Sequence, residues 1–211
     1  MCIRDRPGSA AFSIPPRYRV VGDLHLVNAS PDPVDTSITL TAHLLRESDV
    51  DVRLKPMSMI YRDLLLPPQA RSRTTGDCPA DGGNVLDFSV YYVLPHYHGF
   101  GTGFSLAMHG GPLGEVTVYE TSAVSGSKLG GTLDPPVNVA GSTHVRFSCD
   151  FRNDGDAPIA WGNGDGEMCM FLAYTDSPYT WAGGVFSGNA VVGTAGDGRI
   201  LLQGPCGVAR F

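Results

Sequence analysis

The sequence has little charge and no run of one sign. Only 17% of its 211 residues are Asp, Glu, Lys or Arg, and the formal net charge is −6. Because Lys and Arg never cluster, we expect no binding to nucleic acid or to an anionic membrane surface. No apolar stretch approaches the roughly 20 residues of a membrane-spanning helix, so no membrane span is expected.

Helical periodicity is also absent, as are several catalytic motifs. The chain has no nucleophile elbow, phosphate-binding loop or Cys-x-x-Cys zinc motif. It has instead short stretches of alternating apolar and polar residues, with 27 glycines and 16 prolines spread between them. This pattern predicts an all-β fold, an antiparallel β-sandwich of jelly-roll type without a helical layer.

The first residues do not resemble the start of a domain. The string Met-Cys-Ile-Arg-Asp-Arg is similar to the adapter-derived strings that begin fragmentary environmental reads. We therefore expect residues 1–15 to be non-native or disordered, and Cys2 is set aside with them. On this interpretation the true N-terminus and any signal peptide are missing from the sequence.

Four cysteines remain in the rest of the chain: Cys78, Cys149, Cys169 and Cys206. An even number of widely spaced cysteines in an all-β chain suggests two disulfides and an oxidising location, either secreted or periplasmic/extracellular. The sequence allows three pairings. Four buried free thiols are the alternative.

The motif His96-Tyr97-His98 ends a long predicted strand, Leu86–His98. Side chains two residues apart on a strand share a face, so both imidazoles can reach one metal ion. The even-numbered residues from Leu86 to Leu94 are apolar or aromatic and share the parity of the two histidines. The histidines are therefore expected to extend a mostly apolar face of the strand. Two solvated histidines at a strand end are the alternative.

The segment Glu167-Met168-Cys169 follows about seventy residues after the histidine pair. Alternation along a strand sends Met168 and Cys169 to opposite faces. Two imidazoles with a soft thioether suit copper, especially Cu(I), better than they suit a hard cation.

Two motifs resemble those of the copper type II, ascorbate-dependent monooxygenases, the family of the peptidylglycine α-hydroxylating and dopamine β-monooxygenases. They are H-x-H-x-x-G, from His96 to Gly101, and G-x-x-x-x-E-M-C, from Gly162 to Cys169. The resemblance covers roughly residues 20–180. It implies a catalytic copper bound by His96, His98 and Met168, with O₂ and a small-molecule substrate as reactants and ascorbate as electron donor.

The same resemblance has consequences for the cysteines. If Met168 faces copper, Cys169 on the opposite face can bond Cys149, and Cys78 would then pair with Cys206. The Cys149–Cys169 bridge would fix the strand that presents Met168.

The family has two domains, and the first carries a second copper that relays electrons. We therefore expect residues 16–46 to be a remnant of that N-terminal copper domain and residues 47–211 to be the C-terminal catalytic domain. His25 matches one ligand of the second copper. The adjacent His-His pair of that site is absent here, so an ordinary strand histidine is the alternative.

Three positions depart from the amidating members of the family. Leu94, Met170 and Leu172 stand where those enzymes have the Arg, Asn and Tyr that contact a peptide substrate. A peptidylglycine substrate is therefore not expected. A neutral or hydrophobic substrate suits these three apolar residues better. A non-catalytic copper-binding module and a metal-free ligand-binding β-sandwich are the alternatives to the enzyme.

No partner is expected for His109 or His144.

Overall fold

The computed structural model describes residues 9–19, 21 and 30–211, which divide between two compact units, Met1–Leu54 and Lys55–Phe211. In the first unit, β1 (Ala10–Ala11) pairs in parallel with β2 (Val52–Arg53), and the 3-10 helix η1 (Glu47–Asp49) precedes β2. The units divide after Leu54, whereas the sequence suggested a boundary after residue 46. The origin of residues 16–46 in a preceding domain stays a prediction.

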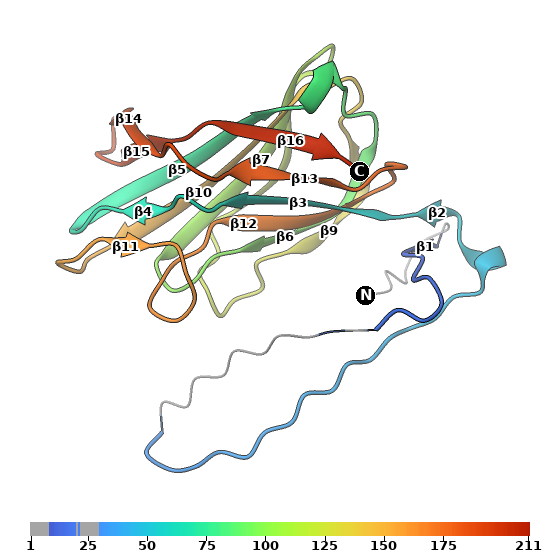
Figure 1. Cartoon of the computed structure of the whole chain (residues 1–211), viewed down its shortest axis with the longest axis horizontal. Helices are drawn as coiled ribbons and strands as arrows, with labels where there is room; N and C mark the ends of the chain where they lie inside the picture. Colours follow the sequence, from blue (N-terminus) through green and yellow to red (C-terminus); the bar gives the residue numbers. More distant parts are fainter. Residues whose placement is uncertain (1–8, 20, 22–29) are drawn as a thin grey trace. The chain divides into compact units, whose positions relative to one another are not determined.

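The second unit contains two six-stranded sheets (Figure 1). In spatial order, the first sheet consists of β14 (Ala190–Thr194), β15 (Ile200–Gln203), β5 (Ala70–Pro79), β10 (His144–Asn153), β7 (Gly101–Gly111) and β8 (Gly114–Thr121). The second sheet consists of β16 (Cys206–Arg210), β13 (Trp181–Val185), β3 (Lys55–Tyr61), β12 (Met170–Thr175), β6 (Ser89–His96) and β9 (Gly131–Asn138). The remaining elements are the β4 (Leu65–Leu66) and β11 (Ile159–Ala160) pair and the 3-10 helix η2 (Asp81–Gly83).

The predicted all-β sandwich is confirmed, and the described residues contain no α-helix. Both sheets are mixed rather than purely antiparallel, because β13 pairs in parallel with β3 and β15 pairs in parallel with β5. The parallel pair of the second sheet follows from chain direction. The chain reverses after β12, which is antiparallel to β3, and β13 then pairs with the far edge of β3. Jelly-roll connectivity stays a prediction.

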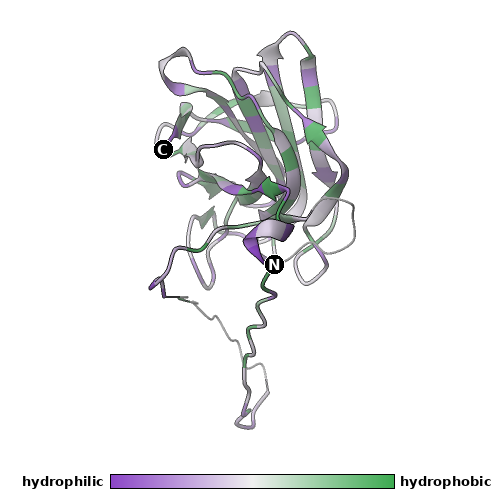
Figure 2. Ribbon diagram, turned by 90° about the vertical axis from the view of Figure 1, so that its right-hand side faces the viewer, coloured by the Kyte–Doolittle hydropathy of each residue, from purple (hydrophilic) through white to green (hydrophobic). Residues whose placement is uncertain are grey.

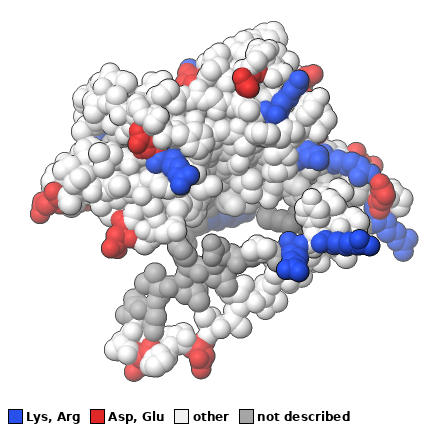
Figure 3. Space-filling view, in the orientation of Figure 1, with Lys and Arg blue, Asp and Glu red and all other residues white. Residues whose placement is uncertain are grey.

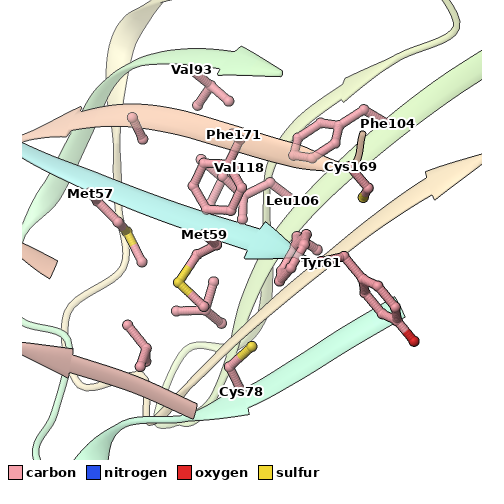
Figure 4. Packing of buried hydrophobic residues seen from close by; sticks show 14 of the residues in the cluster. Met57, Met59, Tyr61, Cys78, Val93, Phe104, Leu106, Val118, Cys169 and Phe171 are labelled. Atoms are coloured by element: carbon pink, nitrogen blue, oxygen red, sulfur yellow. The ribbon is translucent and has the colours of Figure 1, made fainter. Parts of the chain in front are cut away.

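The core lies between the two sheets and is formed by the side chains on the inward-facing side of each strand. Figure 2 shows hydrophobic and hydrophilic residues in bands along the strands, as expected when one face is buried. Phe171 of β12 illustrates the packing: its ring centroid lies 5.7 Å from that of Phe104 in β7 and 5.7 Å from that of Phe147 in β10. Met57 and Met59 of β3 extend the same cluster (Figure 4).

Two disulfides join the sheets across this core. Cys149 of β10 bonds Cys169, which immediately precedes β12, and Cys78 of β5 bonds Cys206 of β16. Both expected pairings are therefore confirmed, and free thiols at these positions are excluded. In the chain-entropy account, bridges with sequence separations of 20 and 128 stabilise the fold by about 3 and about 5 kcal/mol. Two disulfides are typical of proteins that reside in an oxidising compartment.

No helix in the described ranges is long and apolar enough to cross a membrane.

Candidate metal centre

A β-bulge in β6 determines which way the histidine pair points. Val90 is aligned with Thr175 of β12, yet the next aligned residue of β6 is Tyr92, opposite Tyr174, so Tyr91 is an extra residue. The same irregularity interrupts the pairing with β9. An extra residue shifts the alternation of a strand by one position.

The bulge places the histidines on the outer face of the sheet. Val90 is buried, but from Val93 onward the odd-numbered Val93, Pro95 and Tyr97 are buried, whereas Leu94 and His96 are exposed. The expectation that the histidines extend the buried apolar face is therefore wrong. They share a face as predicted, and that face is the one away from the core.

Tyr97, between the two histidines, anchors the motif in the core. Its side chain is 1% exposed, and its hydroxyl donates a hydrogen bond to the carbonyl oxygen of Ala123. Its ring packs directly against Gly101, where an added Cβ would lie 2.1 Å from Cδ2 of Tyr97. The glycine that ends H-x-H-x-x-G is thus required because no larger residue fits against the ring.

The two imidazole rings are close, and one has a defined tautomer. The centroids of His96 and His98 are 5.2 Å apart, with the rings at 87°. Nδ1 of His98 lies 2.9 Å from the carbonyl oxygen of Gly166. Because a carbonyl can only accept, Nδ1 carries a proton, and Nε2 is the nitrogen left to bind a metal.

The pKa of His96 is shifted in the direction that favours the neutral ring. Its pKa is lowered from the ordinary value of 6.5, mainly because packing removes water from the ring and also because His98 lies alongside. A lowered pKa favours the unprotonated imidazole, which is the form that binds metals.

Glu167 joins the two motifs, and its side chain is fully buried. Its Oε1 accepts hydrogen bonds from the backbone N–H groups of His98 and Met168, the latter at 2.7 Å. Its Oε2 accepts from the backbone N–H of Phe100 at 2.9 Å. One carboxylate therefore joins the turn after His96 (residues 96–101, the histidine turn) to residues 167–169 (the methionine segment). The backbone N–H groups of His98 and Met168 donate to the same oxygen.

Alternation from the buried Cys169 directs Met168 away from the core. Cys169 is buried in its disulfide, whereas Met168 is partly exposed, as alternation predicted. Met170 of β12 is aligned with His96 of β6 in an antiparallel pair. Met168 and His98 lie two residues beyond this last aligned pair, and continuation of the same register would place them opposite each other.

These residues fit a soft transition metal in donor type. The three donors are imidazole, imidazole and thioether, a set suited to Cu(I), and Glu167 is occupied by backbone N–H groups. Within the residues that the structure describes, no three His, Cys, Asp or Glu side chains form a metal-binding cluster. His25 lies outside the described residues.

A second histidine pair, not foreseen from the sequence, lies on the outer face of the first sheet. His109 and His144 are directly opposite each other on β7 and β10, and their rings stack with centroids 4.7 Å apart. Nε2 of His109 lies 2.7 Å from a carboxylate oxygen of Asp77, which also pairs with Arg146. These residues form a polar cross-strand cluster separate from His96 and His98.

Comparison with models of known protein families and with curated protein sequences finds no match.

Proposed function

We propose that this chain is the catalytic part of a copper-dependent monooxygenase in which His96, His98 and Met168 bind the catalytic copper. The observation that carries the proposal is the Glu167 tether, which brings the methionine segment to the histidine turn. A fully buried carboxylate satisfied by three backbone N–H groups is a costly device unless the geometry that it fixes is needed.

Copper bound there would support hydroxylation of a substrate C–H bond by O₂, with ascorbate as the donor of two electrons. One oxygen atom enters the product and the other leaves as water, consuming two protons. The protein contributes orientation: Gly166 fixes the tautomer of His98, and Tyr97 holds the backbone between the histidines. The thioether of Met168 favours the reduced metal.

A secreted or periplasmic location agrees with the proposal, because the two disulfides that join the sheets are typical of an oxidising compartment. The electron-relaying copper would belong to the N-terminal domain that precedes this one in the family. That domain would be the partner needed for turnover. His25, in the expected remnant of that domain (residues 16–46), is a candidate ligand of the second copper.

X-ray absorption of the copper-loaded, reduced chain tests the ligand set. We expect one sulfur scatterer that disappears in Met168→Ile and persists in Met170→Leu, the matched control two residues along the same face. His96→Ala and His98→Ala should each abolish tight copper binding, whereas His144→Ala should preserve it. A sulfur signal that survives in Met168→Ile would refute the assignment.

A non-catalytic copper-binding module is the second candidate, favoured by the apolar residues at Leu94, Met170 and Leu172. Oxygen consumption by the copper-loaded chain with ascorbate, with and without neutral substrates, separates the two. Consumption coupled to formation of a hydroxylated product supports the enzyme. Tight copper binding without product, when the electron-relay domain is supplied, identifies the module.

A further inference from the structure

The outer face of the second sheet around His96 is a regular grid of uncharged side chains. Three strands contribute, in register, and each row crosses β3, β12 and β6. The rows are Ile60–Met170–His96, Ser58–Leu172–Leu94 and Pro56–Tyr174–Tyr92. His96 and Met170 therefore occupy the row nearest the candidate copper ligands, and the other rows extend away from it.

The uncharged surface continues onto β13 and β16, while the exposed Arg62 follows Ile60 by two residues along the chain. On β13 the outward residues aligned with Ser58 and Ile60 are Ala182 and Gly184, and on β16 their partners are Ala209 and Gly207. None of these positions carries Asp, Glu, Lys or Arg. In Figure 3 much of the surface of the sandwich is white, with a few charged side chains on its face and others around its margins.

This composition is unusual for an outward sheet face, which is ordinarily polar when water covers it. Leu94 is 39% exposed, and Met170, Leu172 and Ile60 are partly exposed. The rings of Tyr92 and Tyr174 stack at 5.7 Å and close the far end of the grid. Burial raises the pKa of both tyrosines, so their hydroxyls are uncharged at neutral pH.

A ligand bound over these three rows would meet mostly apolar carbon, a few hydroxyls and no charged side chain within the rows. Transfer of an unpaired carboxylate or ammonium from water to such a surface is unfavourable, whereas transfer of a neutral apolar group is favourable. Tyr92 is four residues from His96 along β6, a span of about 13 Å at the usual rise per residue. The grid is thus long enough for a molecule considerably larger than a single ring.

We propose that the grid binds the substrate, and that the substrate is a neutral, largely apolar molecule lacking a carboxylate or ammonium group. The proposal rests on the proposed function for its chemistry, because the bound molecule would present a C–H bond beside His96, His98 and Met168. Leu94 and Leu172 occupy the middle row and determine specificity. Neither side chain offers a partner to a carboxylate or an ammonium group.

Three probes with one carbon skeleton test this inference: 4-phenylbutan-1-ol, 4-phenylbutyrate and 4-phenylbutylamine. Binding to the metal-free full chain is followed by NMR of labelled Ile, Leu and Met methyl groups, so the test does not depend on copper or turnover. We expect the alcohol to bind at least about tenfold more tightly than either charged probe. Its shifts should be confined to Ile60, Leu94, Met170 and Leu172.

Substitutions then place the specificity. Leu94→Arg should weaken binding of the alcohol and strengthen binding of 4-phenylbutyrate, while Leu94→Met should preserve the preference. Val191→Arg is the matched control, since Val191 is 66% exposed on β14 of the other sheet. It adds the same charge away from the grid and should change nothing.

The outcomes separate the two proposals. Copper binding by His96, His98 and Met168 without any preference for the alcohol would overturn the inference and leave the proposed function standing. Preference for the alcohol in a chain that cannot bind copper would refute the proposed function and support the grid as a ligand-binding face. Concentration-dependent self-association that is abolished by Leu94→Arg would identify a second copy of the chain as the occupant and also overturn the inference.

Discussion

Removing the charge of Glu167 should weaken copper binding without removing a ligand. Glu167→Gln keeps the shape of the side chain, and its carbonyl oxygen can replace Oε1 as the acceptor for His98 and Met168. Its NH₂ group would then face the backbone N–H of Phe100, donor against donor. Hydrogen bonds to a charged group contribute about 1.5–3 kcal/mol each, so the loss of one predicts destabilisation of about 2–3 kcal/mol.

The same substitution should lower copper affinity by roughly tenfold or more, as expected when groups that orient metal ligands are altered. Urea unfolding of the metal-free chain measures the first effect, and competition with a Cu(I) chelator measures the second. Asp165→Asn is the matched control, because Asp165 is an exposed carboxylate in the same loop. If Glu167→Gln is as stable as this control and binds copper as tightly, the tether has no role in the site.

Two further predictions concern parts of the fold around the site. Replacing both Cys149 and Cys169 with Ala should reduce the free energy of unfolding by about 3 kcal/mol and weaken copper binding, as measured by urea unfolding and chelator competition; unchanged affinity would contradict this. Burial alone would raise the pKa of Asp77, but hydrogen bonds from Arg146 and His109 hold that pKa below its ordinary value. Asp77 therefore stabilises the fold above about pH 4, and this contribution is lost as pH falls through its folded-state pKa. Asp77→Asn should flatten that part of the acid-unfolding curve, and an unchanged slope between pH 3 and 5 would contradict the assignment.

The sequence was sufficient to predict the all-β sandwich, because alternation is a local property of each strand. The face of the histidines was not predictable in the same way. From Val90 to Leu94 every residue is apolar or aromatic, so both parities look buried and the extra residue at Tyr91 leaves no trace in the pattern. Only the pairing with β12 and β9 reveals the bulge.

Glu167 and the second histidine pair were missed for a related reason. The glutamate belongs to a motif that the sequence displays, but its hydrogen bonds join residues nearly seventy positions apart. His109 and His144 meet because β7 and β10 are neighbours in one particular register. Strand order and register depend on the packing of the whole sandwich, whereas the sequence shows each strand separately.

The anchoring of the two motifs explains why the candidate site faces outward. In H-x-H the central Tyr97 is buried, and in E-M-C both flanking residues are buried, Glu167 under the histidine turn and Cys169 in an inter-sheet disulfide. Since neighbouring side chains on extended backbone point to opposite faces, inward anchors at these positions require the imidazoles and the thioether to point away from the core. The candidate ligands are therefore anchored through their buried neighbours, and their donor atoms are directed away from the core.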